Sequence, residues 1–205
     1  MSNFGYRVLG FGSGGRTVGP FVSATGGNTT ITDGNFKIHV YTGDGTLAIA
    51  NEGTADGSNS VEYFVIAGGG PGGGKYRGAG AGGGGWRTNY PSPATGGLPV
   101  IFTSYPVQVG AGGGNATPSI FSTITSTRGG GHGTPGGSGG GNNGNGSGAG
   151  TGNAGGFSPP EGNPGGNSSG GCSPGAGGGG GANSSGSNGA PGFTTPAGSG
   201  GNGSG

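Results

Sequence analysis

The segment Val61-Glu62-Tyr63-Phe64-Val65-Ile66-Ala67-Gly68-Gly69-Gly70 carries the most hydrophobic strand-like stretch of the chain directly into a run of glycine. Upstream of it, Phe36, Ile38 and Val40 alternate with Lys, His and Tyr, which is the two-residue period of a half-buried strand. No window of the chain has the 3.6-residue period of an amphipathic helix. The sequence therefore predicts an all-β fold with little or no α-helix.

Turn residues separate the predicted strands. Asp33-Gly34-Asn35 follows the strand-like segment 29–32, and Thr42-Gly43-Asp44-Gly45 follows the alternating segment. Both contain glycine, which tolerates the positive φ angles of tight turns. After the second turn, Leu47-Ala48-Ile49-Ala50 is predicted to return as the partner strand of a hairpin. Further strands are predicted within residues 99–109 and 119–125.

Composition limits the classes of function. The chain has 205 residues, of which 66 are Gly and 14 are Pro, and only 6% are charged, with a net charge of +1. No basic or acidic field exists that would attract nucleic acid, an anionic membrane or a charged substrate. Apolar residues cluster before residue 128, so we expect residues 23–128 to form a β-rich, β-sandwich-like body with inserted glycine runs. We expect no membrane insertion, because no apolar stretch approaches the roughly 20 residues of a spanning helix.

The first 22 residues are expected to form a separate docking arm. Phe4, Tyr6, Leu9 and Phe11 are interspersed with glycine, in a segment too short to fold alone. No secretory signal precedes them, so we expect synthesis in a cytoplasm. A single cysteine, Cys172, excludes an internal disulfide and is expected to be a small side chain in a tight place.

Residues 129–205 form a glycine-rich tail that allows more than one structure. A flexible linker is one reading, since glycine loses the most entropy on ordering. A collagen helix is excluded, because Gly165-Gly166-Asn167-Ser168-Ser169 breaks the strict three-residue glycine period. A bundle of polyglycine-II helices is the third reading, since a helix with three residues per turn and no internal hydrogen bonds points its backbone groups outward. Composition alone does not decide between linker and bundle.

Several motifs look catalytic but lack their structural context. Gly10-Phe11-Gly12-Ser13-Gly14-Gly15 fits a dinucleotide-binding pattern, yet no helix can follow it. The glycines before Lys75 suggest a phosphate loop, but Tyr76 stands where the magnesium-binding Ser or Thr belongs. His39 and His132 are far apart in the sequence with no second ligand nearby. We therefore expect no catalytic site, no metal and no cofactor.

Five blocks of the chain, in their order and spacing, resemble the glycine-rich domain of bacteriophage tail-fibre and related virion proteins of the marine-phage type. The blocks are Phe36–Thr42, Tyr63–Gly70, Gly82–Arg87, Tyr105–Gly113 and Ser119–Ser122 leading to Gly129–Gly131. The resemblance covers roughly residues 24–205. It implies stacked polyglycine-II helices whose connecting loops bind host receptors, as in the adhesins at the tips of long tail fibres. It therefore favours an ordered bundle for residues 129–205. The family usually closes with an apolar strand, which Asn202-Gly203-Ser204-Gly205 does not provide.

From the residues and the resemblance together, we expect a virion structural protein located in the phage tail, a tail-fibre or adhesin subunit rather than an enzyme. Its expected partners are other tail proteins, itself as a homotrimer, and a host cell-surface protein or polysaccharide. A purely structural fibre or decoration protein is the alternative. Aromatic and charged loop residues are the receptor-contact candidates: Lys75, Tyr76, Arg77, Trp86, Arg87, Tyr90, Phe157, Pro160, Glu161 and Phe193. The virion-docking candidates are Phe4, Tyr6, Arg7, Leu9 and Phe11.

Overall fold

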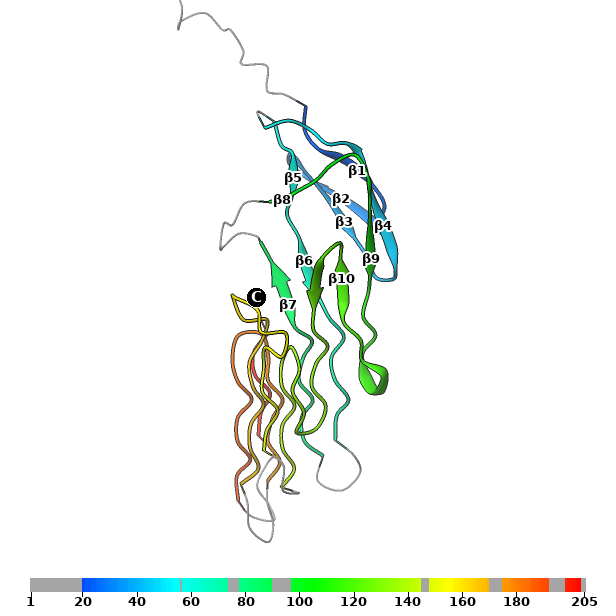
Figure 1. Cartoon of the computed structure of the whole chain (residues 1–205). Coiled ribbons are helices and arrows are strands. Elements are labelled where there is room, and N and C mark those ends of the chain that lie inside the picture. Colours follow the sequence, from blue (N-terminus) through cyan, green and yellow to red (C-terminus); the bar gives the residue numbers. More distant parts are fainter. Residues whose placement is uncertain are drawn as a thin grey trace, which may run out of the picture.

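The computed structural model describes residues 20–55, 57–73, 78–89, 97–144, 148–169, 175–191 and 198–203. Within these residues the fold is all-β, as predicted: every strand pairing within a sheet is antiparallel, and the only helix is a single 3-10 turn, η1 (Gly113–Asn115). The strands lie toward one end of the molecule and extended glycine runs toward the other (Figure 1). The strands are β1 (Ser23–Thr25), β2 (Thr29–Asp33), β3 (Phe36–Val40), β4 (Gly45–Asn51), β5 (Ser60–Val61), β6 (Phe64–Ile66), β7 (Trp86–Thr88), β8 (Leu98–Pro99), β9 (Ser104–Gln108), β10 (Ser119–Phe121) and β11 (Ile124–Ser126).

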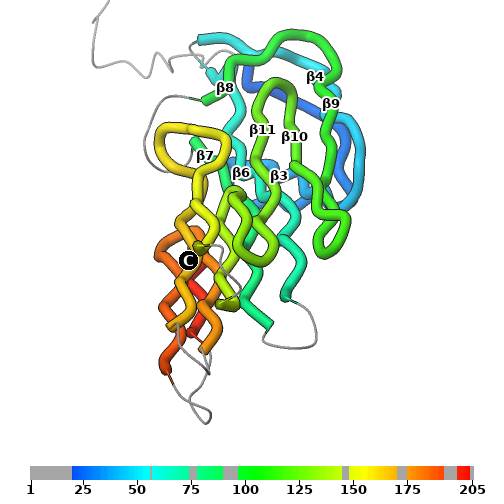
Figure 2. Tube along the Cα trace, turned by 60° about the horizontal axis from the view of Figure 1, so that its bottom comes forward, coloured from blue at the N-terminus to red at the C-terminus, as the bar shows by residue number. Residues whose placement is uncertain are grey.

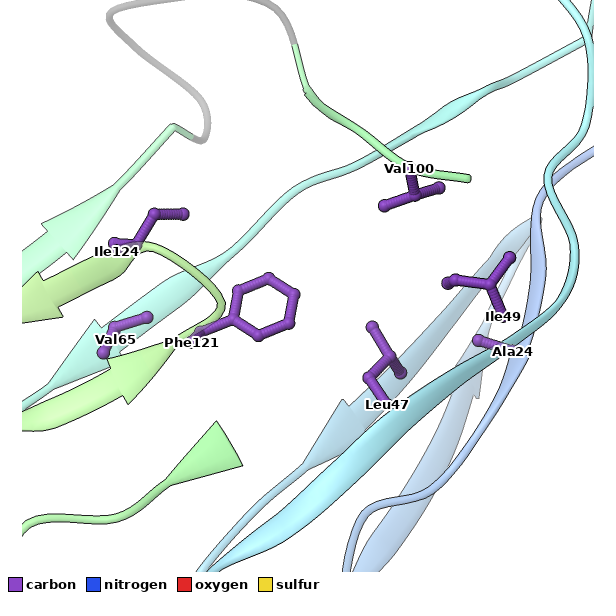
Figure 3. Close-up of a cluster of buried hydrophobic side chains, with 7 residues drawn as sticks. All are labelled: Ala24, Leu47, Ile49, Val65, Val100, Phe121 and Ile124. Atoms are coloured by element: carbon purple, nitrogen blue, oxygen red, sulfur yellow. The ribbon is translucent and has the colours of Figure 1, made fainter. Parts of the chain in front are cut away.

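A five-stranded sheet in the order β1-β4-β9-β10-β11 forms the largest layer. Leu47 and Ile49 are two residues apart in β4, so their side chains lie on the same face of the strand, where both are buried. They meet Val65 of β6 and Phe121 of β10 in one apolar cluster (Figure 3). The described members of this cluster all precede residue 128, where the sequence places the core: Ala24, Leu47, Ile49, Val65, Val100, Phe121 and Ile124.

The β2–β3 hairpin confirms one predicted turn and corrects a predicted pairing. Asp33-Gly34-Asn35 connects the two strands, with Gly34 at a φ of 55°. The pairing predicted between β3 and β4 is wrong, because β3 pairs with β2 whereas β4 pairs with β1 and β9. The prediction that β3 is half buried is also wrong at Phe36 and Ile38, which are 63% and 44% exposed. Among the described strands the hairpin joins no larger sheet, and the side chains of Ile31, Phe36 and Ile38 are exposed.

The predicted strand 61–66 is two short strands with different partners. β5 pairs with β8, and β6 pairs with β7. Between β5 and β6, the backbone of Tyr63 bonds to side chains instead of to a partner strand. The Tyr63 N–H donates to Asn89 Oδ1 at 2.8 Å, and the Thr88 hydroxyl donates to the Tyr63 carbonyl at 2.8 Å.

The glycine runs bond to one another through their backbones. The central run, Ala176–Gly181, is buried throughout. Around it lie five other extended segments, and both views place the tail runs side by side (Figures 1 and 2). These neighbours are residues 80–83, 139–142, 163–166, 184–187 and 198–201.

Hydrogen bonds around the central run repeat every third residue. Its carbonyl groups accept from three neighbours. Run 80–83 donates to Gly177 and Gly180, and run 163–166 donates to Gly178 and Gly181. Run 198–201 donates to Ala176 and Gly179. Its N–H groups donate to the other two neighbours. The N–H groups of Gly177 and Gly180 donate to run 139–142, and those of Gly178 and Gly181 donate to run 184–187. These backbone hydrogen bonds thus join the central run to other segments and repeat every third residue.

The same bonding continues across residue 129, where the tail was predicted to begin. The Gly129 N–H donates to the Gly68 carbonyl at 2.8 Å, and the Gly82 N–H donates to the Gly130 carbonyl at 2.8 Å. Glycine runs inserted between the strands and runs of the tail therefore form one hydrogen-bonded array. Most of its hydrogen bonds join backbone to backbone, and a few side chains add to them, such as Asn163, whose Nδ2 donates to the Gly181 carbonyl at 3.2 Å.

Candidate functional site

Strand β7 and the loop 153–161 bring four of the predicted contact residues together. The Trp86 N–H donates to the Glu161 carbonyl at 3.0 Å, which joins the strand to the loop. The Arg87 guanidinium carbon lies 3.9 Å from the centre of the Phe157 ring, in the geometry of a cation–π contact. We call Trp86, Arg87, Phe157 and Glu161 the β7 joint. The loop lies at the end of the glycine runs nearest the strands (Figure 2).

Glu161 is the anchor of the β7 joint. Its side chain is 0% exposed. One carboxylate oxygen accepts the Thr127 N–H at 2.8 Å, and the other accepts the Gly155 N–H at 3.1 Å. Backbone N–H groups thus satisfy a buried charge, and the carboxylate ties the end of β11 to the loop. The expectation that Glu161 contacts a receptor is wrong, because no part of its side chain reaches the surface.

Asn153 holds the loop in shape. Its Oδ1 accepts the Phe157 N–H at 3.0 Å and the Glu161 N–H at 3.3 Å, while its Nδ2 donates to the Phe157 carbonyl at 3.0 Å. Asn153 has a φ of 53°, in the left-handed region that asparagine tolerates better than most residues. This brace positions Phe157 under Arg87 and turns Glu161 inward.

The other candidates are distributed as follows. Trp86, Arg87 and Phe157 are half buried, and Pro160 is exposed beside them. The Trp86 Nε1 is buried without a hydrogen-bond partner. These residues serve packing within the β7 joint, and Pro160 alone among the described candidates is a freely exposed loop residue. Ten further candidates lie outside the described residues: Lys75, Tyr76, Arg77, Tyr90, Phe193, Phe4, Tyr6, Arg7, Leu9 and Phe11.

Exposed apolar side chains form surfaces that the sequence reasoning missed. Phe64 and Ile66 of β6 are 58% and 54% exposed, and the Phe64 ring lies 5.9 Å from that of Trp86. The signal was present, since Phe64, Val65 and Ile66 must alternate between faces and only Val65 joins the core. A second exposed face on the β2–β3 hairpin carries Ile31 and its partner Ile38.

Charged side chains in the described residues brace loops. Asp44 Oδ1 accepts the Val109 N–H at 2.8 Å, and Glu52 Oε2 accepts the Phe102 N–H at 3.3 Å. Burial raises the pKa of the Tyr41 hydroxyl, which donates to the Thr46 carbonyl at 3.0 Å. In the described part of the chain, no group of three or more His, Cys, Asp or Glu side chains could hold a metal ion. The helix search over those residues found none long and apolar enough to cross a membrane.

Replacing Arg87 with Ala should destabilise the β7 joint. The change removes the contact with Phe157 and the hydrogen bond from the guanidinium to the Thr125 carbonyl at 3.3 Å. We expect a loss of about 1–2 kcal/mol in the free energy of unfolding, measured by urea denaturation. Arg87→Lys is the matched control and should lose less, because it keeps the positive charge. Equal stability of Arg87→Ala and the unmodified chain would show that the contact does not contribute.

The fold and the β7 joint define this chain as an all-β, glycine-rich protein with short antiparallel sheets at one end and hydrogen-bonded glycine runs at the other. Comparisons with protein families, with curated proteins and with solved structures gave no match to it.

Proposed function

We propose that the chain is a virion structural protein, a phage tail-fibre or adhesin subunit, and not an enzyme. The observation that carries the proposal is the hydrogen-bonded array of glycine runs. Its backbone bonds join segments far apart in the sequence, such as Gly80 with Gly177 and Gly139 with Asn163. An array of this kind is a scaffold that can hold variable loops without depending on their side chains.

The glycine runs are, in this proposal, polyglycine-II helices. The three-residue repeat of hydrogen bonds around the central run supports this, since three residues per turn is the period of that helix. None of Gly177–Gly181 has a φ in the left-handed region. Parallel rods of this type would resist bending, which suits a rigid fibre tip.

Host recognition is assigned to loops that interrupt the runs. Lys75, Tyr76 and Arg77 are the leading candidates, because they combine positive charge with an aromatic ring between two glycine segments. The segments on either side are bonded to each other, with the Gly73 N–H donating to the Ala79 carbonyl at 3.0 Å. Residues 1–22 are assigned to attachment on the virion, where other tail proteins would be the partners.

A purely structural fibre protein is the second candidate, and one observation favours it. Four of the five described receptor-contact candidates, Trp86, Arg87, Phe157 and Glu161, take part in internal packing. If the undescribed candidates behave in the same way, the protein would display no receptor site of its own.

An adsorption assay distinguishes a receptor-binding subunit from a purely structural fibre protein. The purified chain should compete with the phage that encodes it for attachment to host cells, and the triple variant Lys75→Ala, Tyr76→Ala, Arg77→Ala should lose most of that competition. The control is Lys37→Ala, which removes an exposed positive charge from β3. Absence of competition by the unmodified chain would contradict receptor binding and leave the structural role.

A further inference from the structure

The central run Ala176–Gly181 has one hydrogen-bonding direction that no described segment fills. A helix with three residues per turn presents its N–H groups in three directions and its carbonyl groups in three others. In all three carbonyl directions, the carbonyl groups accept a hydrogen bond from a neighbouring run. In two of the three N–H directions, the N–H groups donate to a neighbouring run: Gly177 and Gly180 in one, Gly178 and Gly181 in the other. The third N–H direction belongs to Ala176 and Gly179, and in the described part of the chain neither donates to an acceptor. Both residues are buried, where an unpaired N–H is rare in proteins.

The neighbours of the central run locate this direction. Backbone hydrogen bonds join each neighbouring run to the next. The N–H of Gly141 donates to the Gly80 carbonyl, and that of Gly139 to the Asn163 carbonyl. The N–H of Gly186 donates to the Pro164 carbonyl, and that of Ser187 to the Ser199 carbonyl. The neighbours therefore follow one another in the order 80–83, 139–142, 163–166, 184–187 and 198–201. Segments that donate to the central run alternate in this order with segments that accept from it. The first and the last both donate, and they share no hydrogen bond. A position that accepts from Ala176 and Gly179 thus lies between them.

Each of the two segments beside this position has one exposed glycine, in addition to Ala81 in run 80–83 and Ser199 in run 198–201. Gly83 and Gly200 are both exposed. A Cβ on Gly83 would come no closer than 3.9 Å to its nearest neighbour, the Gly180 carbonyl oxygen, and a Cβ on Gly200 no closer than 3.8 Å to the Gly179 carbonyl oxygen. Neither has a φ in the left-handed region, so the fold of a single chain requires glycine at neither place.

Exposed positions of other tail runs differ from these two. Pro164 and Asn188 both point a side chain into solvent. Glycine at positions 83 and 200 would let another backbone approach closely, because a Cβ there would hold that backbone away.

We propose that this position receives a glycine run from a second copy of the chain, so that the protein associates laterally through backbone hydrogen bonds. The occupant must offer carbonyl groups and carry no side chain toward the contact. The chain's own run 198–203 fits, since nothing lies within 4 Å of a Cβ placed on Gly203. With a net charge of +1, two copies meet little electrostatic repulsion. The inference rests on the hydrogen bonds and does not depend on receptor binding.

Sedimentation velocity of the full chain over a wide concentration range tests this proposal. We expect dimers or larger species to form as concentration rises. The double variant Gly83→Ala, Gly200→Ala should weaken association at least tenfold, because it adds a methyl group to each segment beside the proposed contact. The single chain should tolerate both changes, since neither Cβ would come closer than 3.8 Å to its other atoms. Gly114→Ala is the control, since a Cβ there meets nothing within 4 Å and the residue lies in η1, outside the glycine runs beside the proposed contact. A chain that stays monomeric throughout, or a double variant that associates as well as the unmodified chain, would overturn the proposal.

Amide exchange measured by NMR on the unmodified chain provides a readout that needs no variant. Exchange of the Gly179 amide should slow as concentration rises, because association supplies its missing acceptor. The Gly178 amide already donates to Ser187 and should not change. Exchange at Gly179 that is independent of concentration would contradict the proposed contact.

Discussion

The variant Gly178→Ala should dismantle the glycine array while leaving the five-stranded sheet folded. A Cβ on Gly178 would overlap the Ser199 carbonyl oxygen, which already accepts the Ser187 N–H from a neighbouring run. The array cannot make room by moving a side chain, because the obstacle is backbone. Overpacking in a well-packed interior costs about 1–3 kcal/mol and more when nothing can yield, so we expect a loss of about 3 kcal/mol or more.

Thermal unfolding followed by circular dichroism measures this effect. For a chain of this size, a loss of about 3 kcal/mol lowers Tm by roughly 6–12 °C. Gly114→Ala serves again as the control and should be neutral or slightly stabilising, because alanine restricts the unfolded chain. If Gly178→Ala melts at the same temperature as Gly114→Ala, the central run is not packed as described.

The variant Glu161→Ala should have the second largest effect. It removes the acceptor of the Thr127 and Gly155 N–H groups from a site that is 0% exposed. Each buried donor left unpaired costs about 1–3 kcal/mol, so we expect the two donors together to cost about 2–6 kcal/mol in the free energy of unfolding. The joint between β11, β7 and the loop 153–161 should loosen first.

The variant Glu161→Gln separates packing from hydrogen bonding. It keeps the shape of the side chain, but its amide nitrogen would face one of the two donors, so it can satisfy only one of them. We expect a loss between that of Glu161→Ala and zero, measured by urea denaturation. A Glu161→Ala variant as stable as the unmodified chain would show that the carboxylate does not anchor the joint.

Local chemistry made part of the fold predictable. The glycine in Asp33-Gly34-Asn35 fixed the turn between β2 and β3, and alternation placed Leu47 and Ile49 on the core face of β4. The partner of β4 was not predictable in the same way. Its neighbours are β1 and β9, and the choice depends on contacts that form only when distant parts of the chain meet. The same limit applies to Val61–Ile66, where the side chains of Thr88 and Asn89 break the ladder.

The candidate site was less predictable than the fold. Sequence reasoning chose Trp86, Arg87, Phe157 and Glu161 because aromatic and charged loop residues often carry binding energy. The structure brings these four together. Their packing could not be predicted, since the exposure of a side chain is set by its neighbours in the fold rather than by residue type. Glu161 looks like a solvated loop residue until Thr127 and Gly155 are seen to donate to it. Whether glycine runs bond to one another was also open, because Gly177 and Asn142 are far apart in sequence.

Amide hydrogen exchange across residues 129–203 tests the central claim, that the glycine runs form a hydrogen-bonded array. We predict slow exchange at amides that donate between runs, such as those of Gly166, Gly178 and Gly180, and faster exchange at Gly200, for which the array holds no acceptor. Protection should therefore follow the three-residue repeat rather than rise and fall with glycine content. Exchange at the rate of a free chain through all of these runs would contradict the account, and the tail would then be a flexible linker.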